Sequence, residues 1–140
     1  KLAGIYELQK MFPEAARLFR NMADISSTTQ GKINDYIKSG ELFVKGGKYE
    51  DSDFSFNKAM LLGEGLQKNV VKNAMKEAYK TQAKIHLQRG KRKHAMDTYE
   101  KLLTLDLDVG ERREFQNALM NLYQQLGRVR ELMAMKRTIG

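Results

Sequence analysis

The chain contains no cysteine and no tryptophan, and it has a single proline among its 140 residues. Without cysteine, disulfide bonds, thiolate ligands for zinc and thiol nucleophiles are excluded together. No apolar run approaches the roughly 20 residues that a membrane-spanning helix needs, and no secretory hydrophobic region is present. The sequence begins at Lys1 rather than at methionine, so we expect a piece of a longer protein. None of these features indicates a compartment.

Residues that carry catalysis or hold metals are also scarce. His86 and His94 are the only histidines, and no carboxylate accompanies them at a spacing typical of metal ligands. The Gly-Gly-Lys stretch at 46–48 lacks the spacing and the preceding strand of a phosphate-binding loop. The hydroxyl cluster at 26–29 has no base placed to activate it. The sequence therefore predicts no catalytic residue, no metal ion and no cofactor, and we expect the protein not to be an enzyme.

The composition that remains is that of a folded, basic domain. Hydrophobic residues make up 41% of the chain and charged residues 30%, which favours a globular fold over disorder. The length fits one domain spanning residues 1–140. The formal net charge of +8 leaves an acidic protein or a nucleic acid open as a partner. The oligomeric state is not indicated.

Apolar residues recur at spacings of three and four along almost the whole chain, which predicts α-helices throughout. Starts and stops of helices are marked as well. Ser27 to Gln30 form a capping box, and Asp108 with Glu111 forms an acidic version of it. Gly63 and Gly65 indicate that one helix ends and another begins. Pro13 fits the first turn of a helix, where its missing N–H costs nothing.

A pattern of small and aromatic residues around short turns occurs four times. The turns lie at Lys10, Gly47, Gly90 and Gly127. Before each turn come a small residue and then a ring, and after it come another small residue and another aromatic. The first three copies keep this order with Ala3, Tyr6, Ala15 and Phe19; Gly40, Phe43, Ser52 and Phe56; and Ala83, His86, Ala95 and Tyr99. The last copy has Met120, Tyr123, Leu132 and Lys136 in these places.

Such a pattern predicts pairs of antiparallel helices that must stack to bury their apolar faces. It resembles the tetratricopeptide repeat, a family with a nominal period of roughly 34 residues. The resemblance implies an all-α fold, a right-handed superhelical α-solenoid of about four antiparallel helix pairs with the first pair incomplete. The repeats fall at approximately 1–26, 27–64, 66–107 and 109–140.

The chain departs from the family's pattern in several places. The spacing between turns exceeds the nominal period, and no proline closes any repeat. An aromatic opens the first helix at Tyr36 and Tyr79, but Gln116 stands there in the last repeat. Met120 and Leu132 disrupt the contact between small residues, so we expect the last pair to splay or shift. Lys136 suits an outer cap or an exposed end.

The resemblance also implies a function: repeats of this kind line a concave groove that receives a peptide or a partner helix. The groove is expected to consist of the residues that follow each core stripe by one position. These are Asn34, Ile37, Glu41, Lys45, Lys80, Lys84, Gln88, Asn117, Asn121 and Gln125. Amides can pair with an extended peptide backbone, and the two central lysines favour a carboxylate or an acidic side chain. Ile37 and Glu41 stand where the family's chaperone-binding clamp has Lys and Asn, so a chaperone tail is not the expected ligand.

A second candidate surface is the basic edge, formed by Arg89, Lys91, Arg92, Lys93, Arg128 and Arg130. It could bind nucleic acid or another anionic surface. Cations in solvated turns are ordinary, however, and no exposed aromatic accompanies them to stack a base. The groove positions Ile37, Lys80 and Asn117 repeat no base-reading code. We therefore predict a protein-interaction scaffold that supports assembly of a larger complex. Nucleic-acid binding is the alternative, and a purely structural link within a larger assembly is a third possibility.

Overall fold

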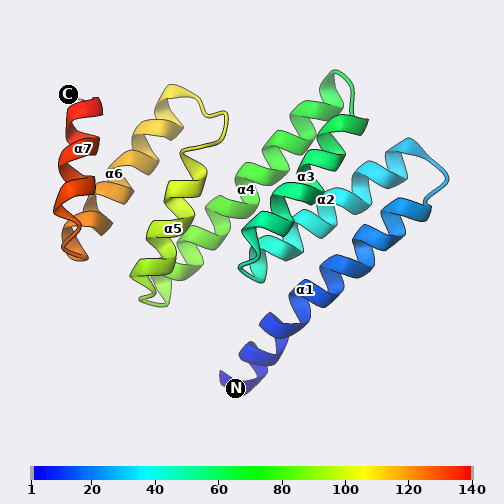
Figure 1. The fold of residues 1–140 in the computed structure, drawn as a ribbon, viewed down its shortest axis with the longest axis horizontal. Coiled ribbons are helices and arrows are strands. Elements are labelled where there is room, and N and C mark those ends of the chain that lie inside the picture. Colours follow the sequence, from blue (N-terminus) through cyan, green and yellow to red (C-terminus); the bar gives the residue numbers. More distant parts are fainter. Residues whose placement is uncertain (1, 140) are drawn as a thin grey trace. The chain divides into compact units, whose positions relative to one another are not determined.

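A computed structural model describes the backbone of residues 2–139 and the side chains of residues 11–139. Within this part of the chain there are seven α-helices and no strand (Figure 1). The helices are α1 (Leu2–Ile25), α2 (Thr29–Lys45), α3 (Tyr49–Leu62), α4 (Leu66–Gln88), α5 (Arg92–Leu102), α6 (Val109–Gln125) and α7 (Val129–Ile139). The predicted all-α fold is confirmed, whereas the handedness of a superhelix stays a prediction.

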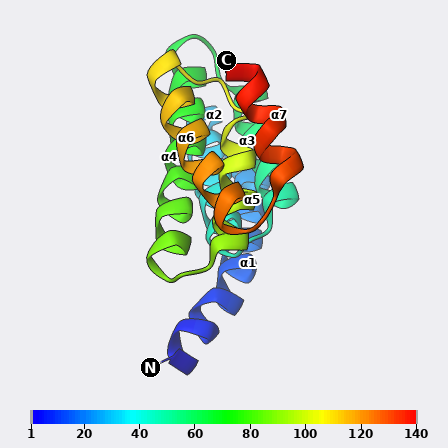
Figure 2. The same cartoon turned by 90° about the vertical axis from the view of Figure 1, so that its left-hand side faces the viewer.

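The chain divides into two compact units, one ending at Ala78 and the next beginning at Tyr79, so that the boundary falls inside α4. In the first unit α2 packs between α1 and α3, and each helix runs antiparallel to the one before it (Figure 1). In the second unit α6 packs on both α5 and α7. The course of α6 and α7 on either side of their short turn is also visible in Figure 2.

Three of the turns between paired helices share one backbone conformation. Gly47, Gly90 and Gly127 have φ angles of 74°, 70° and 70°, in the left-handed region that favours glycine. In each turn the residue after the glycine donates its N–H to the carbonyl of the ring residue of the preceding helix, as a Schellman cap requires. These bonds are Lys48 to Phe43 at 2.8 Å, Lys91 to His86 at 2.9 Å and Arg128 to Tyr123 at 2.8 Å. The predicted turns at these glycines are confirmed.

The turn predicted at Lys10 is wrong, because α1 runs unbroken through that position. A cap of the kind seen at the other turns needs a left-handed residue, and in the described chain only glycine adopts a positive φ. With lysine in that place the helix simply continues. Pro13 consequently lies inside α1 rather than in a first turn. The side chains of Ala3 and Tyr6 lie outside the described residues.

The core of the first unit depends on close approach between α2 and α3. A Cβ atom on Gly40 would lie 2.6 Å from Cε2 of Phe56, so only glycine leaves room for this ring. Beside it, the hydroxyl of Ser39 donates to the carbonyl of Ala16 at 2.8 Å and lies 3.0 Å from the hydroxyl of Ser55. These short side chains are fully buried. Small residues therefore let the backbones of α1, α2 and α3 come together while their polar atoms stay bonded.

In the core of the second unit, aromatic rings of α5 and α6 lie beside a small residue. Ala95 is fully buried on α5, and the ring of Tyr99 lies 6.0 Å from that of Phe115 on α6. The hydroxyl of Tyr123 donates to the Glu100 carboxylate at 2.6 Å, which joins α6 to α5. Burial raises the pKa of Tyr123, and so does this hydrogen bond. The phenol is therefore a stable donor at neutral pH.

Helix starts follow the sequence signals closely. Asp108 and Glu111 form the predicted capping box at the start of α6, with the Glu111 N–H donating to Oδ1 of Asp108 at 2.7 Å. At α2 the capping residue is Thr28 rather than Ser27, and its hydroxyl accepts from the N–H of Gly31 at 3.0 Å. The capping box predicted at 27–30 is thus wrong, because the third residue after Thr28 is Gly31, which has no side chain to complete a box. Gly63 ends α3, and α4 begins at Leu66, as predicted.

Candidate partner-binding surface

The predicted surface residues of α4 lie in the second unit and follow its buried stripe by one position. Tyr79 and Ala83 are fully buried. Their successors differ: the side chain of Lys80 is half-buried and that of Lys84 is exposed. Gln88, in the last turn of α4, is exposed as well. Because residues four apart lie on one face of a helix, Lys80, Lys84 and Gln88 form an outward polar row.

A second polar row runs along α6. Phe115, Leu119 and Leu122 are buried on the inner face of this helix. The predicted surface residues Asn117, Asn121 and Gln125 are exposed and stand four positions apart. They present amide groups, which can both donate to and accept from a peptide backbone. The surface of the second unit therefore carries a row of amide side chains on α6 and a row with two lysines on α4.

The corresponding row on α2 belongs to the first unit and is partly used for internal contacts. Oδ1 of Asn34 accepts from Gln30 at 2.8 Å, and Gln30 accepts in turn from Gln67 of α4 at 2.8 Å. The ammonium group of Lys45 lies 5.9 Å from the centre of the Phe12 ring on α1. Ile37 and Glu41, between these ends, are half-buried. Asn34 and Lys45 therefore help to hold the first unit together.

The basic edge is divided between two turns of the second unit, those before α5 and before α7. Its charge is partly neutralised within the helices that follow. Lys93 contacts both carboxylate oxygens of Asp97 at 2.9 Å, and Arg128 lies 3.7 Å from Glu131. Arg89, Arg92 and Arg130 are exposed, and Lys91 is half-buried. The positive potential of this edge is accordingly weaker than its six cations suggest.

His86 is packed into the second unit, as its place in the repeat predicted. Its side chain is 9% exposed, and its ring centre lies 5.3 Å from that of His94 across the turn. Its Nε2 is 3.3 Å from Nε2 of Gln82, and its Nδ1 is buried without a hydrogen-bond partner. This environment holds an aromatic ring well and an imidazolium ion poorly.

The electrostatic surroundings of His86 act in the same direction. Burial lowers the pKa of its imidazole, and the nearby charges of His94, Lys91 and Arg89 lower the pKa further. Asp97 opposes this effect. His86 is consequently neutral at neutral pH.

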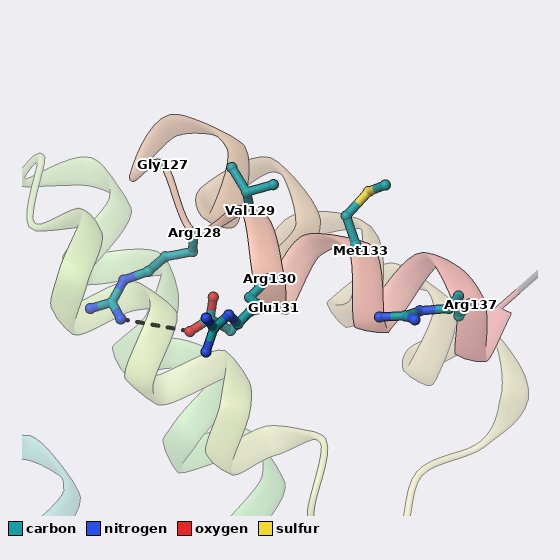
Figure 3. Close-up of a pocket in the computed structure, with 7 residues that line it drawn as sticks. All are labelled: Gly127, Arg128, Val129, Arg130, Glu131, Met133 and Arg137. Carbon is teal, nitrogen blue, oxygen red and sulfur yellow. Dashed lines mark ion pairs between the residues drawn. The ribbon is translucent and has the colours of Figure 1, made fainter.

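One surface was predicted only in part: it includes Arg128 and Arg130 of the basic edge, but its other residues were not predicted. A hollow of about 590 Å³ lies along α7 and is lined by the segment 127–131 together with Met133 and Arg137 (Figure 3). The available signal was the poor fit of Leu132 and Lys136 to the repeat pattern, which predicted an exposed last helix. That pattern did not indicate which side chains would line a hollow.

Within the described part of the chain, no group of three His, Cys, Asp or Glu side chains is arranged to hold a metal ion. Over the same residues, none of the helices combines the length and the apolar character needed to cross a membrane.

Comparison with known families gives a match, which begins at the boundary between the two units and covers the first part of the second. Residues 78–113 match the family described as tetratricopeptide repeat. The chain carries a tetratricopeptide-like repeat. The matched stretch covers the second half of α4, all of α5 and the start of α6. No curated protein and no solved structure matches the chain.

Tetratricopeptide repeats typically act as non-enzymatic scaffolds and generally mediate protein–protein interactions. Lys80, Lys84 and Gln88 all lie on the first helix of the matched repeat.

Proposed function

We propose that this chain is a non-enzymatic scaffold that binds a peptide or a helix of a protein partner through the polar rows on α4 and α6. The observation that carries the proposal is the outward row of Lys80, Lys84 and Gln88 on the first helix of the matched repeat. It is exposed or half-buried while the adjacent stripe of the same helix is buried. Side chains in such a row lie outside the buried stripe of the helix.

The chemistry of the two rows defines the kind of partner. The two adjacent lysines favour a carboxylate or an acidic side chain, because opposite charges across an interface speed association and select the partner. The amides of Asn117, Asn121 and Gln125 can satisfy the N–H and C=O groups of an extended peptide. The row on α2 contributes less in this proposal, because Asn34 and Lys45 already have contacts inside the first unit.

The decisive experiment reverses the central charges. A partner is first captured with the chain and purified, and its affinity is then measured for the wild type and for Lys80→Glu with Lys84→Glu. We expect binding to weaken at least tenfold, about 1.4 kcal/mol. Circular dichroism checks that the variant stays folded.

The control reverses Arg92 and Lys93, exposed cations on the α4–α5 edge. Binding that survives the Lys80 and Lys84 changes but is lost in this control would place the site on the basic edge.

Nucleic-acid binding through that edge is the alternative. The ion pairs of Lys93 with Asp97 and of Arg128 with Glu131 make it the weaker candidate. Salt separates the two functions, because affinity for nucleic acid falls steeply between low and moderate salt through counterion release. A protein complex that depends on amides and two lysines should weaken much less.

A further inference from the structure

Helix α7 differs from the other helices that follow a Schellman turn. α3 buries Ser52, Ser55, Phe56 and Ala59, whereas none of the residues of α7 is buried. Val129 is 66% exposed and Met133 is 52% exposed, although both are apolar. They stand four residues apart, so they form one face of the helix. An apolar face on a helix of a folded domain is a common sign of a binding surface.

This face borders a shallow hollow that is widely open to solvent. The hollow of about 590 Å³ is lined by Val129, Met133 and Arg137, among others. A second hollow of about 380 Å³ shares Met133 and Arg137 and adds Lys136, so the two follow the same helix. Figure 3 shows Val129 and Met133 projecting from the same side of α7.

The charges that line the hollow are predominantly positive. Its single carboxylate, that of Glu131, is held by Arg128 at 3.7 Å (Figure 3). Arg130 and Arg137 also line it and are exposed. The lining therefore combines apolar side chains with arginines, and arginine pairs well with carboxylates.

We propose that the α7 face, defined by Val129, Met133, Arg130 and Arg137, docks an acidic amphipathic helix of another protein. The apolar side chains of that helix would contact Val129 and Met133, and its carboxylates would pair with Arg130 and Arg137. This surface is separate from the polar rows on α4 and α6.

The charge of the chain argues against a second copy as the occupant. Two chains that each carry a net charge of +8 repel one another, and the arginines of α7 would meet further cations. The sequence of α7, VRELMAMKRTI, offers no aromatic side chain on which a nucleic-acid base could stack. An acidic amphipathic helix matches both the apolar side chains and the arginines of this lining.

The test uses the 140-residue chain and a labelled synthetic helix of 18 residues, with leucines at helical spacing on one face and glutamates beside them. Fluorescence anisotropy measures its affinity. We expect saturable binding that weakens at least tenfold in Met133→Lys with Arg137→Glu. A scrambled peptide of the same composition, which has no apolar face, should bind at least tenfold more weakly than the amphipathic peptide.

A matched control is Thr81→Lys with Arg92→Glu, which changes the net charge by the same amount at exposed positions on α4 and α5. Affinity for the amphipathic peptide should stay within twofold in this control. Since the mutated side chains are exposed, circular dichroism should show no unfolding.

Four results would overturn the proposal. The first is equal affinity for the amphipathic and the scrambled peptide, which would mean attraction by charge alone. The second is undiminished binding by Met133→Lys with Arg137→Glu, or loss in the Lys80 and Lys84 variant instead. The third is a dimer of the chain, seen by sedimentation, that Met133→Lys abolishes. The fourth is binding to phosphatidylserine vesicles without binding to the peptide.

Discussion

The helices α3 and α7 occupy the same place after a Schellman turn, yet they pack differently. Five and nine residues after its turn glycine, α3 has Ser52 and Phe56, both fully buried. At the same offsets α7 has Leu132, which is half-buried, and Lys136, which is exposed. The turns themselves are alike, with φ near 70° at both glycines. The comparison shows that the turn sets the direction of the second helix, while the residues at these two offsets decide how much of it is buried.

The largest effect should come from the aromatic position of α3. Phe56→Ala removes a fully buried ring and leaves a cavity between α2 and α3, so we expect a loss of about 3–5 kcal/mol in the free energy of unfolding. Lys136→Ala, at the same offset in α7, should change it by no more than about 0.5 kcal/mol. Urea denaturation followed by circular dichroism measures both. Equal effects of the two variants on the free energy of unfolding would show that the residue type at this offset does not decide how much of the helix is buried.

The turns and most core positions of these hairpins could be predicted from sequence because they depend on local chemistry. A left-handed turn needs glycine, and a close helix pair needs a small residue such as Gly40. The same rule explains the error at Lys10: the spacing suggested a turn, but lysine cannot supply the positive φ. The capping residue of α2 was also misjudged. Serine is intrinsically the better N-cap, so Ser27 was as plausible as Thr28, and the course of the backbone selects Thr28.

Contacts between distant residues could not be predicted from the sequence. Tyr123 bonds to Glu100 and Gln67 to Gln30, and these pairs are 23 and 37 residues apart. Their pairing depends on the rotation of each helix about its own axis, which a small–aromatic pattern leaves open. The pair Lys93–Asp97, four residues apart on one helix, was accessible by contrast. The residues of the predicted groove remain a prediction, and the hollow along α7 emerged only with the packing of its hairpin.

A smaller effect is expected at the contact that allows Phe56 to be buried. In Gly40→Ala the new Cβ would lie within 2.6–2.9 Å of three ring atoms of Phe56. Helix propensity would gain about 1 kcal/mol, but overpacking costs typically about 1–3 kcal/mol. We expect a net loss of up to about 2 kcal/mol in the free energy of unfolding, by the same urea measurement.

Gly110→Ala is the matched control for Gly40→Ala, because its Cβ would meet nothing closer than Oδ1 of Asp108 at 3.4 Å. Without a clash the gain in helix propensity should prevail, by up to about 1 kcal/mol. If both alanine variants were stabilised alike, the new Cβ at position 40 would cause no strain, which would mean that α2 and α3 can move apart to make room for it. The close approach between them would then not be what distinguishes this hairpin from the one that ends in α7.

The smallest effect concerns pH and the one histidine that occupies a ring position. Phe43 and Tyr123 hold that position beside α3 and α7, and their rings carry no positive charge at any pH, whereas His86 can be protonated. Burial, followed by the charges of His94 and of the turn cations Lys91 and Arg89, lowers the pKa of His86 below its ordinary value of 6.5. The unfolded chain then binds a proton more readily than the folded one, so stability falls as the pH drops.

Neutral His86 contributes its full share to the free energy of unfolding above the pKa of 6.5 that it has in the unfolded chain. This share declines as the pH falls from there toward the lower pKa of the folded chain. We therefore expect the urea midpoint of the second unit to decrease between pH 7.5 and pH 5. His86→Phe places at this position the same ring that Phe43 supplies in the first unit, and most of the decrease should vanish in this variant. His94→Gln should retain much of the decrease, because burial is the largest cause of the lowered pKa of His86. An equal decrease in wild type and His86→Phe would assign the pH dependence to other groups. It would also remove His86 as the feature that makes this hairpin respond to pH differently from its neighbours.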